Sequence, residues 1–204
     1  MRVTQIEELT RSRYKVYIDG AFAFVLYKRE LRLYHIEPDA EIAGEDFDAI
    51  MKEVLPKRAR LRAMNLLQRR DYTTAQLRTK LEQGLYPETV IDGALEYVAS
   101  YRYTDDLRYA VQYIVFHEES RSRRRIEQDL AGKGISRETI QKAWSEWEDQ
   151  GGVQDEEAQI RKLLAKRKYD PDTADYKETQ KQAVFLMGKG FSSDKIHQVL
   201  REFL

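Results

Sequence analysis

Two adjacent carboxylates, Asp105 and Asp106, are the first residues in this sequence whose types suggest chemistry. Paired acids serve in enzymes as general acid and base, and they also bind metal ions. Both roles need a histidine or a third carboxylate at suitable spacing, and the pair has neither. The acids follow Thr104, a residue type that caps helices, and acids in a first turn suit the positive end of the helix dipole. We therefore interpret Asp105 and Asp106 as the start of a helix.

Other residue types that carry catalysis are sparse. The chain has no cysteine, which excludes thiolate catalysis, zinc-thiolate sites and disulfide bonds, and its histidines (His35, His117 and His197) are far apart in the sequence. Gly132-Lys133-Gly134 and Gly188-Lys189-Gly190 resemble fragments of a phosphate-binding loop but lack its other glycines and its Lys-Ser/Thr ending. We therefore predict that the protein is not an enzyme and that it uses no cofactor and no metal.

Clusters of basic residues are better candidates for a functional surface. The densest cluster stands at an expected helix start and comprises Arg121, Arg123, Arg124 and Arg125, and we add Lys133 from the end of the same helix. Cations at a helix start oppose the helix dipole, so this placement costs stability and favours a role in binding carboxylates or DNA phosphates. The alternative is a solvated helix start without a binding role.

A second basic stretch runs from Lys57 to Lys80, where eight basic residues stand against one acid. It follows an acidic stretch from Glu37 to Glu53, where seven acids stand against one base. The candidate contact residues of the basic stretch are Arg62, Arg69 and Arg70. Alternatively, this stretch is a charged outer face that compensates the acidic stretch within the same molecule.

The whole chain is electrically balanced, with 35 acidic and 35 basic residues, so it is not a general binder of nucleic acid. Separate patches of opposite sign favour docking on a surface that itself carries both signs. A protein or a nucleoprotein partner fits that description.

The helices that position these residues occur in three copies of one unit. Each copy has a helix with an apolar residue, then a glycine, an apolar residue, a helix-start pair and an acid. The three copies run from Leu81 to Glu88, from Leu130 to Glu138 and from Leu186 to Asp194. We expect the glycines Gly84, Gly134 and Gly190 to take the left-handed conformation that ends a helix, and we pair Leu85 with Ile135 and Phe191 as the apolar residues after them.

The next helix of each copy starts at Tyr86-Pro87, Ser136-Arg137 or Ser192-Ser193, with Pro87 expected at the first helical position and the serines as caps. Its buried face follows an i, i+4, i+7 spacing. The residues of this face are Val90, Ala94 and Tyr97; Ile140, Trp144 and Trp147; and Ile196, Leu200 and Phe203. Upstream helices are predicted over 59–70, 107–118 and 156–167, and Thr73 with Gln76 predicts a capping box.

The N-terminal segment differs from the rest. Alternating residues 14–18, the turn pair Asp19-Gly20 and apolar residues 22–26 predict a β-hairpin. Because a lone hairpin is marginal, it needs either a third strand from Val3 to Leu9 or a helix to pack on. Short helices are expected over 28–33 and 46–55.

The predicted fold is therefore mainly α, with tandem three-helix, helix-turn-helix-like repeats in an elongated curved array and a small N-terminal β-hairpin subdomain. We expect the parts to be residues 1–56, 57–104, 105–152 and 153–204. The N-terminus lacks a signal-peptide pattern, and the longest apolar run, Ala21 to Tyr27, is too short to cross a membrane. We expect a cytoplasmic protein.

One joint in the chain resembles a known family, the RecX regulators of RecA. Members show tandem three-helix repeats and a joint reading roughly Gly-Tyr-Leu-Asp-Asp, then Tyr-Ala or Phe-Ala, with Lys-Gly-Ile downstream. Here the joint reads Arg102-Tyr103-Thr104-Asp105-Asp106, then Tyr109-Ala110, with Lys133-Gly134-Ile135 downstream. Arg102 and Thr104 depart from the pattern, and both departures concern the geometry of a turn. The resemblance covers residues 57–204 and, less sharply, the hairpin.

The resemblance implies a function. A RecX-like protein is expected to lie in the groove of the RecA–DNA filament as a monomer, with weak DNA contact at most, and to inhibit homologous recombination and repressor cleavage. That activity would affect DNA repair and the SOS response. Two other classes stay open: a helix-turn-helix-like protein that acts directly on DNA, and a helical scaffold for another partner.

Overall fold

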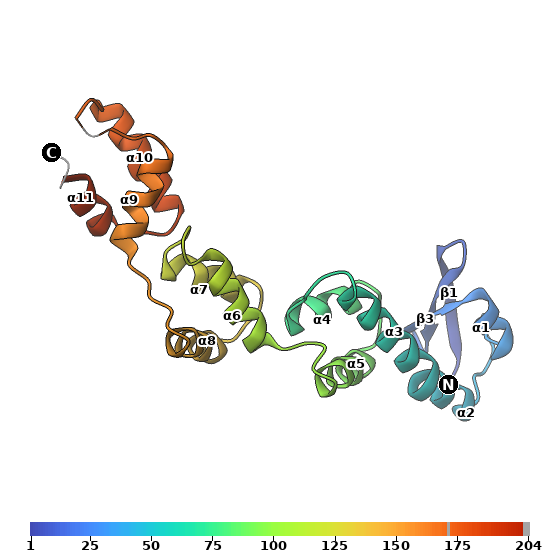
Figure 1. Ribbon diagram of the computed structural model, residues 1–204. Coiled ribbons are helices and arrows are strands. Elements are labelled where there is room, and N and C mark those ends of the chain that lie inside the picture. Colours follow the sequence, from blue (N-terminus) through green and yellow to red (C-terminus); the bar gives the residue numbers. More distant parts are fainter. Residues whose placement is uncertain (171, 202–204) are drawn as a thin grey trace. The chain divides into compact units, whose positions relative to one another are not determined.

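The computed structural model describes residues 1–170 and 172–201 of the chain. These residues fold into two compact units, Met1–Asp105 and the part from Asp106 onward. The N-terminal unit holds a small sheet and the first helical repeat, and the second unit holds the other two repeats (Figure 1). The mainly helical fold with three tandem three-helix domains is confirmed.

The sheet has three antiparallel strands in the order β1-β2-β3, namely β1 (Val3–Thr10), β2 (Arg13–Ile18) and β3 (Ala21–Tyr27). Asp19 and Gly20 have positive φ angles of 48° and 85°, as a tight hairpin turn between β2 and β3 requires. The predicted hairpin is therefore confirmed, and of the two ways to stabilise it the chain uses the third strand, β1.

A helix predicted to end near Leu55 instead continues through it. Helix α1 (Lys28–Leu33) is separate, but α2 (Gly44–Ala49) runs through a π-helical segment (Ile50–Val54) into α3 (Leu55–Leu67). Pro56 lies in the first turn of α3. Proline lacks the N–H that a regular helix needs and its ring crowds the preceding turn, so the helix widens just before it and does not stop.

Three helices form each repeat. The first repeat adds α4 (Thr74–Glu82) and α5 (Glu88–Ser100) to α3. The second has α6 (Asp106–His117), α7 (Arg123–Gly132) and α8 (Arg137–Asp149), and the third has α9 (Glu156–Lys166), α10 (Tyr176–Gly188) and α11 (Ser193–Arg201). The helices predicted over 107–118 and 156–167 agree with α6 and α9 within one residue. The capping box of Thr73 and Gln76 is confirmed.

The predicted buried faces are confirmed wherever the structure describes them. Val90 and Ala94, then Ile140, Trp144 and Trp147, and then Ile196 and Leu200 are buried, while Tyr97 is half-buried. Phe203 lies outside the described residues.

The first repeat departs from the predicted turn by one residue. Gly134 and Gly190 have the expected left-handed φ angles of 83° and 89°, but in the first copy Leu85 is left-handed, with φ of 61°, and Gly84 is not. The amide of Tyr86 donates to the carbonyl of Leu81, as the amides of Ile135 and Phe191 do to theirs. Tyr86, and not Leu85, is thus the counterpart of Ile135 and Phe191, because each of the three lies five residues after the leucine of its helix; only the glycine stands one position earlier in this copy.

Two further residues of that turn, Pro87 and Gly84, also have roles other than the predicted ones. Pro87 precedes the helix as its N-cap, where Ser136 stands in the second repeat, so it is not the first helical residue. Gly84 is needed for space, since an added Cβ would lie 2.8 Å from the Tyr86 ring.

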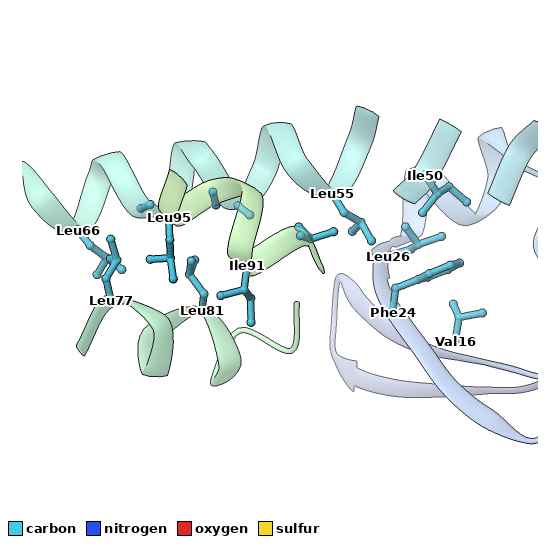
Figure 2. Close-up of a cluster of buried hydrophobic side chains, with 14 of the residues drawn as sticks. Val16, Phe24, Leu26, Ile50, Leu55, Leu66, Leu77, Leu81, Ile91 and Leu95 are labelled. Atoms are coloured by element: carbon cyan, nitrogen blue, oxygen red, sulfur yellow. The ribbon is translucent and has the colours of Figure 1, made fainter. Parts of the chain in front are cut away.

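The apolar side chains form three clusters. One cluster is shared by the sheet and the first repeat: Figure 2 shows Val16, Phe24 and Leu26 of the sheet, the helical residues Leu77, Leu81 and Ile91, and Leu55 between them. The second and third repeats have a cluster each, around Trp144 and around Leu186.

Candidate partner-binding surfaces

Helix α7 carries the arginine cluster, and its start is built by Ser122. The Ser122 hydroxyl is buried and accepts a hydrogen bond from the amide of Arg125 at 3.2 Å, as expected of an N-cap. Arg121 therefore precedes the cap, and Arg123, Arg124 and Arg125 form the first helical turn. The four arginines do not form one patch of unmatched charge: two share a single carboxylate, one pairs with two other acids, and Arg124 has no ion pair among the described residues.

Arg121 and Arg125 both face Asp129, a carboxylate of α7. Arg125 Nε lies 3.1 Å from Asp129 Oδ1, and Arg121 donates to Asp129 Oδ2 and to the Tyr113 hydroxyl, the latter at 2.8 Å. Lys133 lies over the Tyr113 ring, 5.2 Å from its centre. Three of the predicted binding cations therefore surround one acid and one phenol of the same repeat.

Burial and these cations shift two nearby groups. Burial raises the pKa of Tyr113 above its usual value, an effect that Arg121 opposes. Burial also lowers the pKa of His117, and Arg121 adds to this because a cation disfavours a second positive charge. Both effects favour the neutral form of His117.

Arg123 joins α7 to α8. Its guanidinium pairs with Glu127 at 3.2 Å and with Glu148 at 2.8 Å, and it lies over the Trp144 ring at 4.5 Å from the centre. Two carboxylates and a ring leave it little capacity for a partner.

Arg124 differs from its neighbours because its exposed side chain has no ion pair within the described part of the chain. It lines a groove of about 480 Å³ between α7 and α8, together with Arg137, Gln128 and Gln141. Arg137 is also exposed, at the first position of α8. The sequence reasoning missed Arg137, although a cation at a helix start, the signal that singled out Arg124, applies to it equally.

The start of helix α7 also contacts the third repeat. The Ser122 amide donates to the carbonyl of Lys189 at 3.2 Å, and the Arg123 amide donates to Glu156 Oε1 at 3.3 Å. A Cβ added at Gly190 would lie 2.5 Å from Arg125 Cβ. Glu156 thus places a negative charge at the positive end of α7, which offsets part of the cost that the arginines impose there.

The candidate contact residues of the basic stretch from Lys57 to Lys80 also lie in different environments. Arg62 lines a pocket beside the sheet, Arg69 is exposed in the turn after α3, and Arg70 lies over the Tyr72 ring, 4.3 Å from its centre. Within the described residues, no ion pair joins this stretch to the acidic one: Arg58 pairs with Glu30, and Arg78 with Asp92. Direct compensation between the two stretches is therefore not what the structure shows.

The described residues offer neither a metal site nor a membrane-spanning helix. They contain no group of three or more His, Asp or Glu residues that could hold a metal ion, so Asp105 and Asp106 gain no third carboxylate. Helix α6 begins at Asp106, and Thr104 is buried just before it. No helix among the described residues is both long and apolar enough to cross a membrane.

Each of the three repeats matches a separate domain of one protein family. Residues 59–97 match the first three-helix domain of RecX, residues 105–143 the second, and residues 155–200 the third. The arginine cluster therefore lies in the part that matches the second domain.

Curated relatives extend the likeness over the N-terminal sheet. The regulatory protein RecX of Caldanaerobacter subterraneus subsp. tengcongensis is 30% identical over 202 residues, which cover 98% of each chain. That of Clostridioides difficile is 28% identical over 208 residues, covering 99% of this chain and 95% of the relative. Both are named as regulatory proteins and not as enzymes.

A crystal structure titled regulatory protein RecX has the same fold, with a TM-score of 0.61 at 24% identity over 98% of both chains. Three matched domains in order and full-length relatives at up to 30% identity lead to one assignment. The chain belongs to the RecX family of regulatory proteins.

Proposed function

We propose that this chain binds the filament of the RecA recombinase in the cytoplasm and inhibits it by occupying its surface, without catalysing a reaction. The observation that carries the proposal is the match of all three repeats, in order, to the domains of a regulatory family. The expected consequences are slower strand exchange and slower RecA-stimulated cleavage of repressors, and so an effect on DNA repair and the SOS response.

The groove between α7 and α8 is the surface that we assign to the filament. Arg124 and Arg137 present two exposed guanidinium groups there, beside the amides of Gln128 and Gln141. Guanidinium groups bind carboxylates and phosphates with two parallel hydrogen bonds, so this groove suits a filament that offers protein acids and DNA phosphates.

The other arginines of the cluster are held by ion pairs, including Arg123, which lines the same groove together with its partner Glu127. Arg121 and Arg125 pair with Asp129, and Arg123 pairs with Glu127 and Glu148. A partner would therefore have to displace an existing ion pair to reach them. Several weak contacts along a filament add up, which favours binding to filaments over binding to a single RecA molecule.

The test is a single charge reversal in the groove. Arg124→Glu is expected to weaken binding to RecA filaments about tenfold or more, because it replaces a charge-assisted contact with repulsion. Lys142→Glu is the matched control, since it reverses one cation on α8 whose only ion pair within the described residues is with exposed Glu138. Binding is measured by fluorescence anisotropy of RecA on labelled single-stranded DNA at low salt, and helicity by circular dichroism.

Two results would count against the proposal. If the unaltered chain leaves filament length, ATP hydrolysis and strand exchange unchanged at equimolar amounts, RecA is not its target. If Arg124→Glu and Lys142→Glu bind equally well, the groove is not the contact surface, although RecA binding itself would stand.

Direct DNA binding is the second candidate. Helices α7 and α8 are joined by a short turn, as in a helix-turn-helix, and Arg137 stands at the start of the second helix, where such motifs contact bases. The balanced charge and the burial of Trp144 and Trp147 weigh against it. Tight, sequence-specific binding to bare duplex DNA in the absence of RecA would favour this function instead.

A further inference from the structure

A basic pocket lies in the N-terminal unit between the sheet and the first repeat. Its volume of about 420 Å³ lies within the range of small-ligand sites. Four cations line it: Arg13 from β2, Arg58 and Arg62 one turn apart on α3, and Lys80 from the last turn of α4. No aspartate or glutamate is among the described residues that line this pocket.

Neutral acceptors hold three of these cations in place. Arg13 Nη2 donates to the Gly84 carbonyl at 3.1 Å, Arg58 Nη1 to the Val25 carbonyl at 3.0 Å, and Lys80 Nζ to the side-chain oxygen of Gln83 at 3.2 Å. A neutral acceptor orients a cation without cancelling its charge. The pocket is therefore organised before any ligand arrives.

Little negative charge balances the cluster. Arg58 is matched by Glu30, but Arg13, Arg62 and Lys80 have no ion pair within the described residues. The carboxyl end of α4 also lines the pocket, and a helix end carries only about half a negative charge. Three unmatched cations against about half a charge leave an excess that disfavours the empty pocket and favours an anion.

Tyr86 shows how closely the guanidinium groups gather. Burial raises the pKa of its hydroxyl, and the charges of Arg58, Arg13 and Arg62 oppose that rise. All three therefore act on one phenol, whose neutral hydroxyl is a further donor for a ligand oxygen.

We propose that this pocket binds a phosphate group, either of a free phosphate compound or of a nucleic-acid strand. Arginine donors fork toward two oxygens at once, and a phosphate offers several oxygens and more than one negative charge, which a single carboxylate does not. Arg13, Arg62 and Lys80 are the principal ligands because none of them is committed to a carboxylate among the described residues, and Arg62 and Lys80 are the two chosen for the test. The inference concerns the N-terminal unit and does not rest on RecA binding.

The experiment is calorimetric titration of the full chain, without RecA, at low salt. The titrants are inorganic pyrophosphate and two copies of a short single-stranded oligonucleotide, one with a 5′-phosphate and one without. Binding of pyrophosphate alone assigns the pocket to free phosphate compounds, preference for the 5′-phosphorylated strand assigns it to strand ends, and equal binding of both strands assigns it to backbone phosphates.

Variants decide whether this pocket is the site. Replacing Arg62 and Lys80 together by Gln is expected to weaken binding about tenfold or more, while Lys57→Gln, an exposed cation on α3 outside the pocket, is expected to leave it unchanged. Circular dichroism and the melting temperature show that each variant folds. No binding of any titrant, or binding that the double variant retains, overturns the proposal. Because RecA is absent, either result leaves the RecA proposal untouched.

Discussion

Apolar packing joins the sheet to the first repeat, whereas polar contacts join the second repeat to the third. In the N-terminal unit one apolar cluster runs from Phe24 in β3 to Ile91 in α5. In the other unit each repeat has its own cluster, and hydrogen bonds and ion pairs connect them, such as Lys162 with Glu119 at 2.7 Å. Apolar burial involves no charges that salt could screen or pH could titrate, whereas ion pairs between repeats are affected by both.

The largest effect is expected from opening the shared cluster. Phe24→Ala removes a fully buried ring that packs beside Phe47 and should cost about 3–5 kcal/mol. Since the cluster is shared, hydrogen exchange should speed up in α4 and α5 as well as in the sheet. Faster exchange confined to the strands would show that the first repeat does not depend on the sheet.

The next effect concerns the contact between the second and third repeats. Gly190→Ala forces a Cβ to within 2.6 Å of the Ser122 hydroxyl oxygen at a residue whose φ is 89°. Gly151→Ala is the control, because its φ of 90° imposes the same backbone strain but nothing lies within 4 Å of the new Cβ. Chemical denaturation should show about 1–2 kcal/mol lost in the control and about 1–3 kcal/mol more in Gly190→Ala. Equal losses would mean that the third repeat does not seat on Ser122.

A smaller effect is expected from the exposed ion pair of that joint. A double-mutant cycle with Lys162→Ala and Glu119→Ala should give only a small favourable coupling, because both side chains are largely solvated. The coupling should shrink in high salt. A coupling that does not change with salt would contradict the view of this joint as electrostatic.

The smallest effect is expected with pH. The pKa of His117 is lowered by burial, then by Arg121, Lys133 and Lys189, the last of these from the third repeat, while Asp129 acts in the opposite direction. A histidine whose folded pKa lies below its unfolded pKa takes up protons more readily when unfolded, so stability is present at higher pH and declines as pH falls toward and through that unfolded value. Denaturation between pH 8 and pH 6 should show this decline, and His117→Gln should lessen it. An unchanged pH dependence in the variant would show that His117 does not cause the decline in stability.

Much of the fold was predictable from short-range signals. The Asp19-Gly20 turn, the capping box at Thr73 and the buried face of Trp144 and Trp147 each depend on residues within a few positions of one another. The prediction from sequence failed where the same local residue pattern is compatible with two backbone conformations. Pro56 widened a helix where an end was expected, and Leu85 took the conformation assigned to Gly84.

The candidate sites were only partly predictable. The sequence identified the basic clusters, but adjacent arginines gave no indication of which charge would be matched. Arg123 meets Glu148 of α8, whereas Arg124, which lines the groove between α7 and α8, meets no carboxylate among the described residues. One strand and several helices separate Arg13 from Lys80 in the sequence, so their shared pocket could not be predicted from it.

The sequence by itself determined the three helical repeats, the hairpin and the lack of cysteine chemistry, because composition, helix caps and periodicity act over a few residues. Tertiary structure alone decided which cations are free, which repeat rests on which, and that Arg13, Arg62 and Lys80 share one pocket. Electrostatic interactions depend on distance in space, and folding sets that distance with little regard to position along the chain.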